Sequence, residues 1–268
     1  MQSSDQSKFF QFICELPKQI SEAAKLIKGI DIKSLSKKYD QIVLTGMGGS
    51  AIAGDLLKYY LRDELEIPFI INRNYSLPNF VNRKTLVFAC SYSGNTEETL
   101  NSARMAMKRG ATIIGVSSGG ALEKLLQEHN LTFIKIPSGY PPRQALGYMF
   151  FPLLNLIQHL GLISPKTEDI HETITVLEEI RKRSDPTKMY DHNLSNLIAK
   201  KLYKKIPVIY TATEFLYPVV TRWRNQFNEN SKVLAFSNVL PELNHNEIMG
   251  WEAPPEVLKN FNILFLRD

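Results

Sequence analysis

Two short segments rich in glycine and hydroxyl side chains each follow a run of strand-forming residues and precede a helical pattern. The first is Gly46-Met47-Gly48-Gly49-Ser50-Ala51, and the second is Ser91-Tyr92-Ser93-Gly94-Asn95-Thr96. Glycines let backbone N–H groups approach an anion closely, and a helix N-terminus favours negative charge. Ser and Thr hydroxyls add short donors that converge on a phosphate. Both segments are therefore candidate phosphate-binding loops.

The first loop is a poor match to the sequence patterns of nucleotide-binding loops. It lacks the Gly-Lys-Ser/Thr of a P-loop, and although it matches G-x-G-x-x-A, the acidic cluster 63–66 precedes the next strand, which ends in Asn72-Arg73. A tight turn without a ligand stays an alternative, as does simple helix capping by Thr96 in the second loop. Two such loops at one sheet edge nevertheless favour a sugar-phosphate site, because a dinucleotide site has no use for the second loop.

The elements that position these loops are predicted to be βαβ units. Short β-rich runs alternate with amphipathic helical stretches, which indicates a parallel sheet covered on both faces. The expected strands are 41–45, 68–71, 85–90, 112–116 and 132–136, and the clearest helices are 50–62 and 96–109. The first 38 or so residues are expected to be helical, and the apolar segment 145–163 is too polar for a membrane span and indicates a buried helix.

The chain is predicted to contain two such α/β domains. A helical segment 1–38 precedes a first domain over 39–163, a helical linker covers 164–195, and a second domain covers 196–268. Strands of the second domain are expected at 206–210, near 233–236 and at 262–266, with a helix around 217–227. Because only three strands are recognisable there, we expect the second domain to be truncated at its C-terminus.

Composition sets the remaining limits. Of the 268 residues, 44% are apolar, and the net charge is +5. That is enough apolar surface for a core, and so mild a charge favours small anions over nucleic acid as partners. Cys14 and Cys90 cannot form a disulfide framework or a tetrahedral zinc site. Since the polar N-terminus also lacks a signal-peptide pattern, a cytoplasmic protein without membrane association is expected.

Both loops resemble the phosphosugar-binding loops of sugar isomerase (SIS) domains. Three further motifs, Pro141–Gly147, Asn228–Lys232 and Asn244–Glu247, narrow the resemblance to the bifunctional phosphoglucose/phosphomannose isomerases of the phosphoglucose isomerase superfamily. This resemblance implies two tandem SIS domains, each an αβα sandwich with a parallel sheet. It also implies a homodimer with shared active sites, a small sugar phosphate as substrate, and neither metal nor cofactor.

The resemblance gives a role to each motif residue. In the loops, the hydroxyls are expected to hold the phosphate and the glycines to line the sugar: Gly48, Gly49, Ser50, Ser91, Ser93 and Thr96. Arg143 is expected to steady the reacting oxygens, and Glu229 to move the proton between C1 and C2. His245 is expected to open the sugar ring from the neighbouring subunit.

Aldose–ketose isomerisation requires these residue types on chemical grounds as well. One carboxylate can remove the proton beside the carbonyl and return it to the adjacent carbon. A fixed guanidinium stabilises the enediolate charge, and an imidazole exchanges protons near neutrality, as ring opening requires. Together with this chemistry, the resemblance implies a metal-independent isomerase that interconverts glucose 6-phosphate, mannose 6-phosphate or both with fructose 6-phosphate through a cis-enediolate.

Other functions stay open. A non-enzymatic SIS regulatory protein would need the loops but not Glu229 or His245, and the N-terminal helices lack the basic face that DNA binding uses. A different phosphosugar isomerase of the same fold is a further alternative. An alternative for Arg143 is a surface ion pair, and an alternative for Glu229 is a solvated residue at a helix end. Glu247 is expected either to orient His245 or to cap the following segment.

Overall fold

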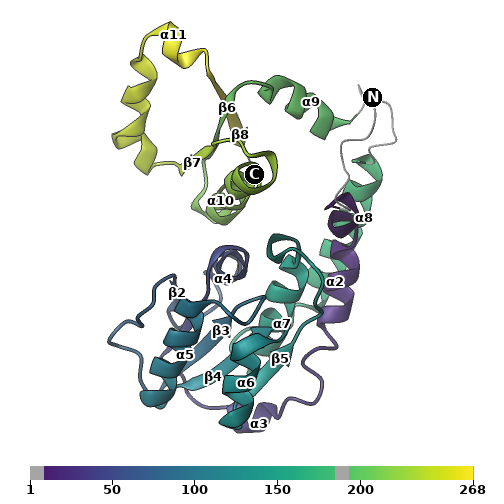
Figure 1. Cartoon of the computed structure of the whole chain (residues 1–268), viewed down its shortest axis with the longest axis vertical. Helices are drawn as coiled ribbons and strands as arrows, with labels where there is room; N and C mark the ends of the chain where they lie inside the picture. Colours follow the sequence, from purple (N-terminus) through teal and green to yellow (C-terminus); the bar gives the residue numbers. More distant parts are fainter. Residues whose placement is uncertain (1–8, 185–192, 268) are drawn as a thin grey trace. The chain divides into compact units, whose positions relative to one another are not determined.

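The computed structural model describes residues 9–184 and 193–267, which form two compact units divided between Glu178 and Glu179 (Figure 1). The first eight residues of the predicted N-terminal segment and residues 185–192 of the predicted linker lie outside the described residues. Within the described part of the chain, every helix is too short or too polar to cross a bilayer.

The first unit is built on a five-stranded parallel sheet. Its strands are β1 (Gln41–Thr45), β2 (Phe69–Asn72), β3 (Thr85–Cys90), β4 (Thr112–Ser117) and β5 (Thr132–Lys135). They lie in the order β2-β1-β3-β4-β5, so the chain moves outward from β1 to β2 and then crosses over to β3. This crossing makes the boundary between β1 and β3 a topological switch point, where ligands bind beside the carboxyl ends of the strands.

Helices cover both faces of this sheet (Figure 1). They are α1 (Phe9–Cys14), α2 (Leu16–Ala23), α3 (Ile32–Leu35), α4 (Gly48–Tyr60), α5 (Glu97–Lys108), α6 (Gly120–Glu128) and α7 (Leu146–His159). On one face, Ile42 and Phe88 pack with side chains of α2, α4 and α7. On the other face, Val43 and Val87 pack with α5 and α6. Successive strand residues point to opposite faces, so continuous apolar strands supply both cores.

The predicted α/β fold with parallel sheets is confirmed, and the strands of this unit lie within two residues of their expected bounds. The apolar segment expected as a buried helix is α7, most of whose residues are buried. The N-terminal segment is less helical than expected, because a stretch of turns separates α2 from α3. Gly29, at φ 90°, lies in that stretch, in a left-handed conformation that interrupts a helix.

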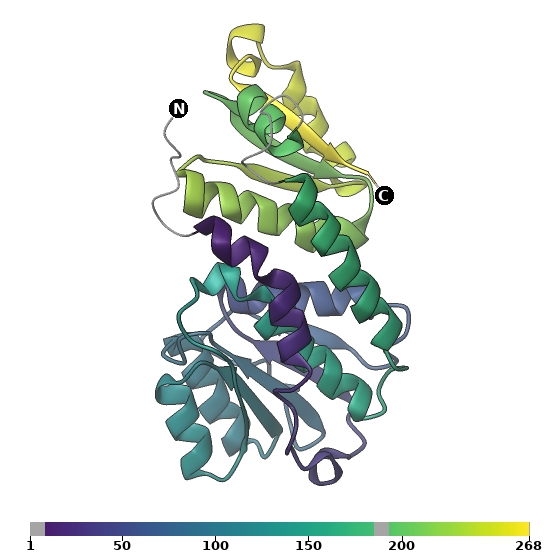
Figure 2. The same ribbon diagram turned by 90° about the vertical axis from the view of Figure 1, so that its right-hand side faces the viewer.

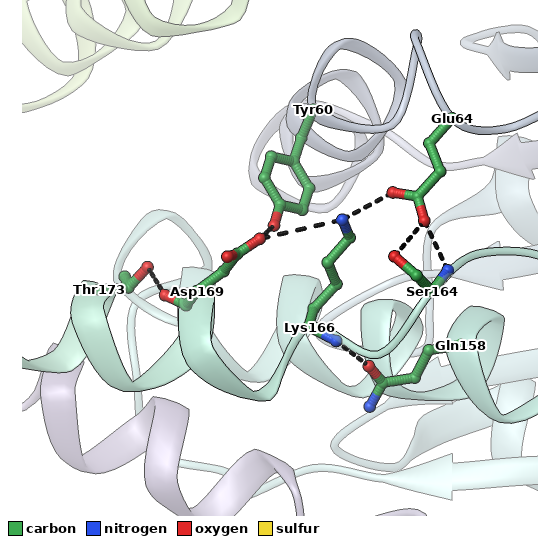
Figure 3. A network of polar contacts seen from close by, with 7 residues as sticks. All are labelled: Tyr60, Glu64, Gln158, Ser164, Lys166, Asp169 and Thr173. Carbon is green, nitrogen blue, oxygen red and sulfur yellow. Dashed lines mark hydrogen bonds and ion pairs between the residues drawn. The ribbon is translucent and has the colours of Figure 1, made fainter.

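A polar network holds the beginning of α8 (Thr167–Arg183) against the first unit (Figure 3). Lys166 Nζ lies 2.6 Å from Glu64 Oε2, and Glu64 Oε1 accepts hydrogen bonds from the N–H and the hydroxyl of Ser164. These contacts hold the pKa of Glu64 at about 2, below its ordinary value of 4.5, with the hydrogen bond from Lys166 as the largest cause. The network thus depends on an ionised Glu64.

Tyr60 and Asp169 extend this network along α8. The Tyr60 hydroxyl donates to the Asp169 carboxylate, and Lys166 Nζ lies 4.0 Å from the same carboxylate and 5.7 Å from the centre of the Tyr60 ring. Burial and the neighbouring carboxylates raise the pKa of Tyr60. The helix expected over 164–184 therefore forms, and its first turn is tied to the end of α4.

The second unit contains a three-stranded parallel sheet. Its strands are β6 (Ile206–Thr211), β7 (Phe236–Val239) and β8 (Phe261–Leu266), and its helices include α9 (Leu194–Leu202), α10 (Tyr217–Gln226) and α11 (Pro255–Leu258). The order β7-β6-β8 repeats that of the first three strands of the other sheet. α10 lies along one face of this sheet (Figure 2). The connection from β6 to α10 carries Glu214 and, in the first turn of α10, Pro218.

The strand expected near 233–236 begins later than predicted, at Phe236. A π-helical turn, η4 (Phe227–Ser231), extends α10, and Lys232 adopts a left-handed φ of 56°. The Val233 N–H still donates to the Phe227 carbonyl, so Val233 completes the helical segment instead of starting the strand. Apolar residue type alone therefore placed the strand too early.

Removing the charge of Glu64 tests how the network stabilises the fold. A carboxyl group whose pKa is lowered by folding stabilises the protein above its unfolded pKa, and this contribution disappears as the pH falls. We expect Glu64→Gln to lower the free energy of unfolding by about 1 kcal/mol at pH 7. The difference from the parent should shrink as the pH falls from 4.5 towards 2, as measured by urea denaturation.

The matched control is Glu66→Gln, since Glu66 is exposed and lies two residues away. This variant should follow the parent within experimental error at each pH. If the free energy of unfolding of Glu64→Gln differs from that of the parent by the same amount at every pH, the role given to the network is contradicted.

Candidate active site

The two predicted loops meet at the switch point of the first sheet. The first follows β1 and begins α4 at Gly48, and the second follows β3 and leads into α5. Gly46 lies directly against β3, because a Cβ there would be 2.8 Å from the Cys90 carbonyl oxygen. The Ser50 hydroxyl accepts a hydrogen bond of 3.1 Å from the Tyr92 N–H. The two loops therefore form one continuous surface.

The loop hydroxyls gather at this surface. Ser91 Oγ lies 2.8 Å from Thr96 Oγ1 and accepts a hydrogen bond of 3.1 Å from the Gly94 N–H. Ser91 is buried, whereas Ser93 is exposed, and its hydroxyl accepts from the Asn95 N–H at 3.2 Å. Thr96 occupies the N-cap position of α5, yet its side chain does not cap the helix. Its hydroxyl belongs to the loop cluster, so the capping alternative does not describe this side chain.

A third loop, which the sequence patterns did not single out, supports the second. Residues 117–120 run from the last residue of β4 to the first residue of α6. The Ser118 hydroxyl donates to the Tyr92 carbonyl at 2.8 Å, and the Leu122 N–H donates to the Gly94 carbonyl at 2.9 Å. The signal that would have found this loop is Ser-Ser-Gly-Gly between a strand and a helix, which is the same kind of pattern as in the other two.

Gly94 is required both by its backbone conformation and by its neighbour. Its φ is 70°, in the left-handed region, and a Cβ at this position would lie 1.7 Å from the Gly119 carbonyl oxygen. The left-handed conformation disfavours any residue with a Cβ, and the Gly119 carbonyl oxygen leaves no space for a Cβ unless a loop moves. The second and third loops thus touch backbone to backbone.

Arg143 reaches the same edge on a short 3₁₀ helix, η1 (Pro142–Gln144), that precedes α7. Gly49 packs against it: a Cβ on Gly49 would lie 3.0 Å from the Pro142 carbonyl oxygen and 3.3 Å from the Arg143 Cα. The Arg143 Cζ lies 5.8 Å from the centre of the Phe9 ring, within cation–π range. The first unit therefore brings Arg143 together with the predicted substrate-binding residues of the first loop.

Glu229 belongs to the second unit, where it lies on the π-helical turn η4. Turns of this kind are rare and occur frequently at functional sites. The Glu229 side chain is exposed, and Lys232 Nζ donates to the Glu229 carbonyl at 2.7 Å. Burial lowers the pKa of the nearby Arg222, and the Glu229 charge partly counteracts this. The predicted base is thus an accessible carboxylate with a guanidinium close by.

His245 also belongs to the second unit, at the end of the 3₁₀ helix η5 (Glu242–His245). Leu243 of the same turn is buried beside Val208 and Tyr210, which fixes the turn while His245 stays exposed. Across residues 9–184 and 193–267, no three His, Cys, Asp or Glu side chains gather as a metal site requires.

Glu247 takes neither of the two roles expected for it. Its carboxylate accepts hydrogen bonds from the Tyr210 hydroxyl and from Asn238 Nδ2, which ties it to β6 and β7. Capping is done by Asn246, whose Oδ1 accepts from the Glu247 N–H at 2.6 Å. Burial, followed by the bond to this carboxylate, raises the pKa of Tyr210. Glu247 therefore fixes the segment after His245 onto the sheet.

The chain is similar to known proteins over both units. Residues 34–134 match the SIS domain, and residues 191–268 match the bacterial phosphoglucose isomerase C-terminal SIS domain. A bifunctional phosphoglucose/phosphomannose isomerase from Caldicellulosiruptor bescii is 44% identical over 97% of this chain and 76% of its own length. The chain belongs to the bifunctional phosphoglucose/phosphomannose isomerase family. A family member from Aquifex aeolicus is 35% identical over 93% of this chain and 76% of its own length.

Solved structures confirm the fold of this family member. The C-terminal domain of glucosamine-fructose-6-phosphate aminotransferase from Francisella tularensis has a TM-score of 0.72 at 20% identity, covering 98% of this chain and 76% of that one. Tagatose-6-phosphate ketose/aldose isomerase from Escherichia coli has a TM-score of 0.63 at 15% identity, covering 95% and 71%. The resemblance to tandem SIS domains, inferred from five motifs, is therefore confirmed.

Replacing Gly94 tests the backbone contact between loops in this phosphoglucose/phosphomannose isomerase family member. Gly94→Ala must strain a left-handed residue and also displace the Gly119 carbonyl, so we expect a loss of about 2 to 4 kcal/mol in the free energy of unfolding. Gly161→Ala is the matched control, because Gly161 has φ 72° with nothing within 4 Å of its Cβ position.

Gly161→Ala should lower the free energy of unfolding by about 1 kcal/mol, from backbone strain alone. Both variants would be measured by urea denaturation. Equal losses of unfolding free energy for Gly94→Ala and Gly161→Ala would contradict a close contact between Gly94 and the Gly119 carbonyl.

Proposed function

We propose that this chain interconverts glucose 6-phosphate and mannose 6-phosphate with fructose 6-phosphate. The observation that carries the proposal is the meeting, at the β1/β3 switch point, of two hydroxyl-bearing loops, with the Arg143 turn packed against Gly49. A phosphate monoester needs many short donors at one point, and a fixed cation beside it stabilises charge that develops during reaction. The names of the family relatives support the same substrates.

In this proposal the loops bind the substrate phosphate, and Gly48 and Gly49 line the sugar. The phosphate ligands are Ser50, Ser91, Ser93 and Thr96, together with N–H groups at the start of α4 and α5. Gly48 is exposed with φ 48°, and nothing lies within 4 Å of its Cβ position, so the sugar can approach the backbone there. The Arg143 guanidinium then steadies O1 and O2 of the enediolate.

The proposed proton transfers involve the second unit. His245 exchanges the ring proton that opens the pyranose. Glu229 removes the proton from C2 of the open aldose and returns it to C1 of the enediolate, and the reverse direction uses the same carboxylate. We further propose a homodimer in which His245 serves the active site of the neighbouring subunit. The exposed position of His245 on a fixed turn supports this arrangement.

Two other functions are tested by the same assay. A D-glucosamine-6-phosphate 4-epimerase from Sulfolobus acidocaldarius is 32% identical over 79% of this chain, so epimerisation at C4 is a second candidate. A regulatory protein would bind sugar phosphates without changing them. Purified protein would be incubated in D₂O with fructose 6-phosphate or with glucosamine 6-phosphate and followed by NMR.

Our proposal expects glucose 6-phosphate and mannose 6-phosphate to form from fructose 6-phosphate, with deuterium at C2, because the enediolate takes its proton from an exchangeable carboxyl. Epimerisation of glucosamine 6-phosphate without isomerisation would favour the second candidate. Binding of fructose 6-phosphate without product or deuterium incorporation would favour the regulatory function and overturn our proposal.

Substituting the proposed base tests its role. Glu229→Gln keeps the shape of the side chain but cannot accept the proton, so kcat should fall by about 10²- to 10⁴-fold. The dissociation constant for fructose 6-phosphate, measured by calorimetry, should change by less than about threefold, since the phosphate contacts are untouched. Glu256→Gln, an exposed substitution in the same unit, is the control. A Glu229→Gln enzyme that isomerises at the parental rate would rule out this assignment.

Mixing two inactive variants tests whether active sites are shared between subunits. In a mixed dimer of Glu229→Gln and His245→Ala, one of the two sites would contain both native residues. Since random pairing makes half of the dimers mixed, the mixture should recover about a quarter of the parental activity. The measurement is the coupled rate after the subunits have been unfolded and refolded together. No recovery in refolded, correctly dimeric protein would contradict the sharing of sites.

A further inference from the structure

The turn that carries Arg143 is also held by a glutamine on the N-terminal helix α2. Gln19 Nε2 donates to the Gln144 carbonyl at 2.8 Å, and Gln19 Oε1 accepts from the Gly147 N–H at 3.1 Å. Both polar ends of the amide are thus bound to backbone groups one and four residues after Arg143. These residues are separated from Gln19 by more than a hundred positions, so the contact is purely tertiary.

Gln19 is fully buried, with 0% of its surface exposed. Burying an amide is unfavourable unless its donors and acceptors find partners, so packing alone would favour an apolar side chain here. Gly147 makes room for the contact, because a Cβ at that position would lie 2.6 Å from the Gln19 Cβ. The contact therefore requires an amide side chain at Gln19 and the absence of a side chain at Gly147.

The neighbouring side chains of α1 and α2 hold the other end of the same turn. The Tyr140 hydroxyl donates to Glu15 Oε2 at 2.6 Å, and the Tyr140 ring centre lies 5.1 Å from that of Phe12. Phe9 lies under the guanidinium itself, 5.8 Å from Arg143 Cζ. The segment from Tyr140 to Gly147 is thus fixed by the N-terminal helices both before and after Arg143.

We propose that Gln19 is a positioning residue for Arg143: it fixes the backbone of the turn and so aims the guanidinium at the reacting oxygens. This inference rests on the proposed function, because it concerns the cation that stabilises the enediolate. Among the described residues, the Gln19 side chain donates to and accepts from the Arg143 turn and bonds to no loop hydroxyl, so its loss should act on transition-state stabilisation and leave phosphate binding intact.

Kinetics of two variants give the first test. Gln19→Met has a similar length but removes both hydrogen bonds to the turn. Ser21→Ala is the matched control, since it removes a hydrogen bond within the same helix α2, from the Ser21 hydroxyl to the Pro17 carbonyl, and leaves the contacts of the turn in place. We expect Gln19→Met to lower kcat about 10- to 100-fold with KM changed less than about threefold, and Ser21→Ala to change kcat less than about twofold.

Binding gives a second readout that does not depend on turnover. The probes are 5-phosphoarabinonohydroxamate, whose hydroxamate mimics an enediolate, and inorganic phosphate. Gln19→Met should weaken binding of the hydroxamate about 10-fold or more and leave binding of phosphate within about twofold. In the Arg143→Ala background, adding Gln19→Met should change hydroxamate binding less than about twofold, because the group that Gln19 positions is absent.

Each outcome supports or overturns the inference. Equal effects of Gln19→Met and Ser21→Ala, or an equal effect of Gln19→Met with and without Arg143, would show general structural damage and overturn it while the proposed function stands. A parent protein that neither isomerises fructose 6-phosphate nor prefers the hydroxamate to phosphate would overturn the proposed function and this inference together. Should Gln19→Met not fold, as judged by its melting curve, Gln19→Glu replaces it, since an ionised carboxylate cannot donate to the Gln144 carbonyl.

Discussion

The candidate site depends on close backbone contact at the carboxyl edge of the first sheet. Three glycines permit it: Gly46 lies against the end of β3, Gly94 against the third loop, and Gly49 against the Arg143 turn. A Cβ at any of these positions would meet a backbone carbonyl oxygen at 3.0 Å or less. Because the loops touch through their backbones, the short Ser and Thr side chains converge without having to reach across a gap.

The parts of the fold that local pattern determines could be predicted from the sequence. β1 and β3 are continuous apolar runs bounded by polar residues, and both have their expected bounds. The loops after them combine glycine with hydroxyls at a strand-to-helix junction, which is a local signal as well. The start of β7 was misplaced because the π-helical turn that delays it leaves no mark in the apolar periodicity.

Contacts between residues far apart in the chain could not be predicted from the sequence. Gln19 is an ordinary polar residue on an amphipathic helix, and only the packing of α2 on α7 shows that both ends of its amide bind the Arg143 turn. Glu247 was expected to act on its sequence neighbours, but its carboxylate is bound by Tyr210 and Asn238 on two strands. The motifs around Glu229 and His245 supply a carboxylate and an imidazole, the two groups that the proposed proton transfers need. The catalytic roles of these two residues are proposals.

The two sheets repeat one strand order but present opposite electrostatics to an anion. After β1 the chain offers glycines and the N–H groups at the start of α4, whereas after β6 it offers the Glu214 carboxylate and Pro218, which has no N–H to donate. The helix dipole and the local charges therefore favour an anion after β1 over one after β6. In the proposed function, the first sheet binds the phosphate end of the substrate, and the second sheet keeps the strand order without that role.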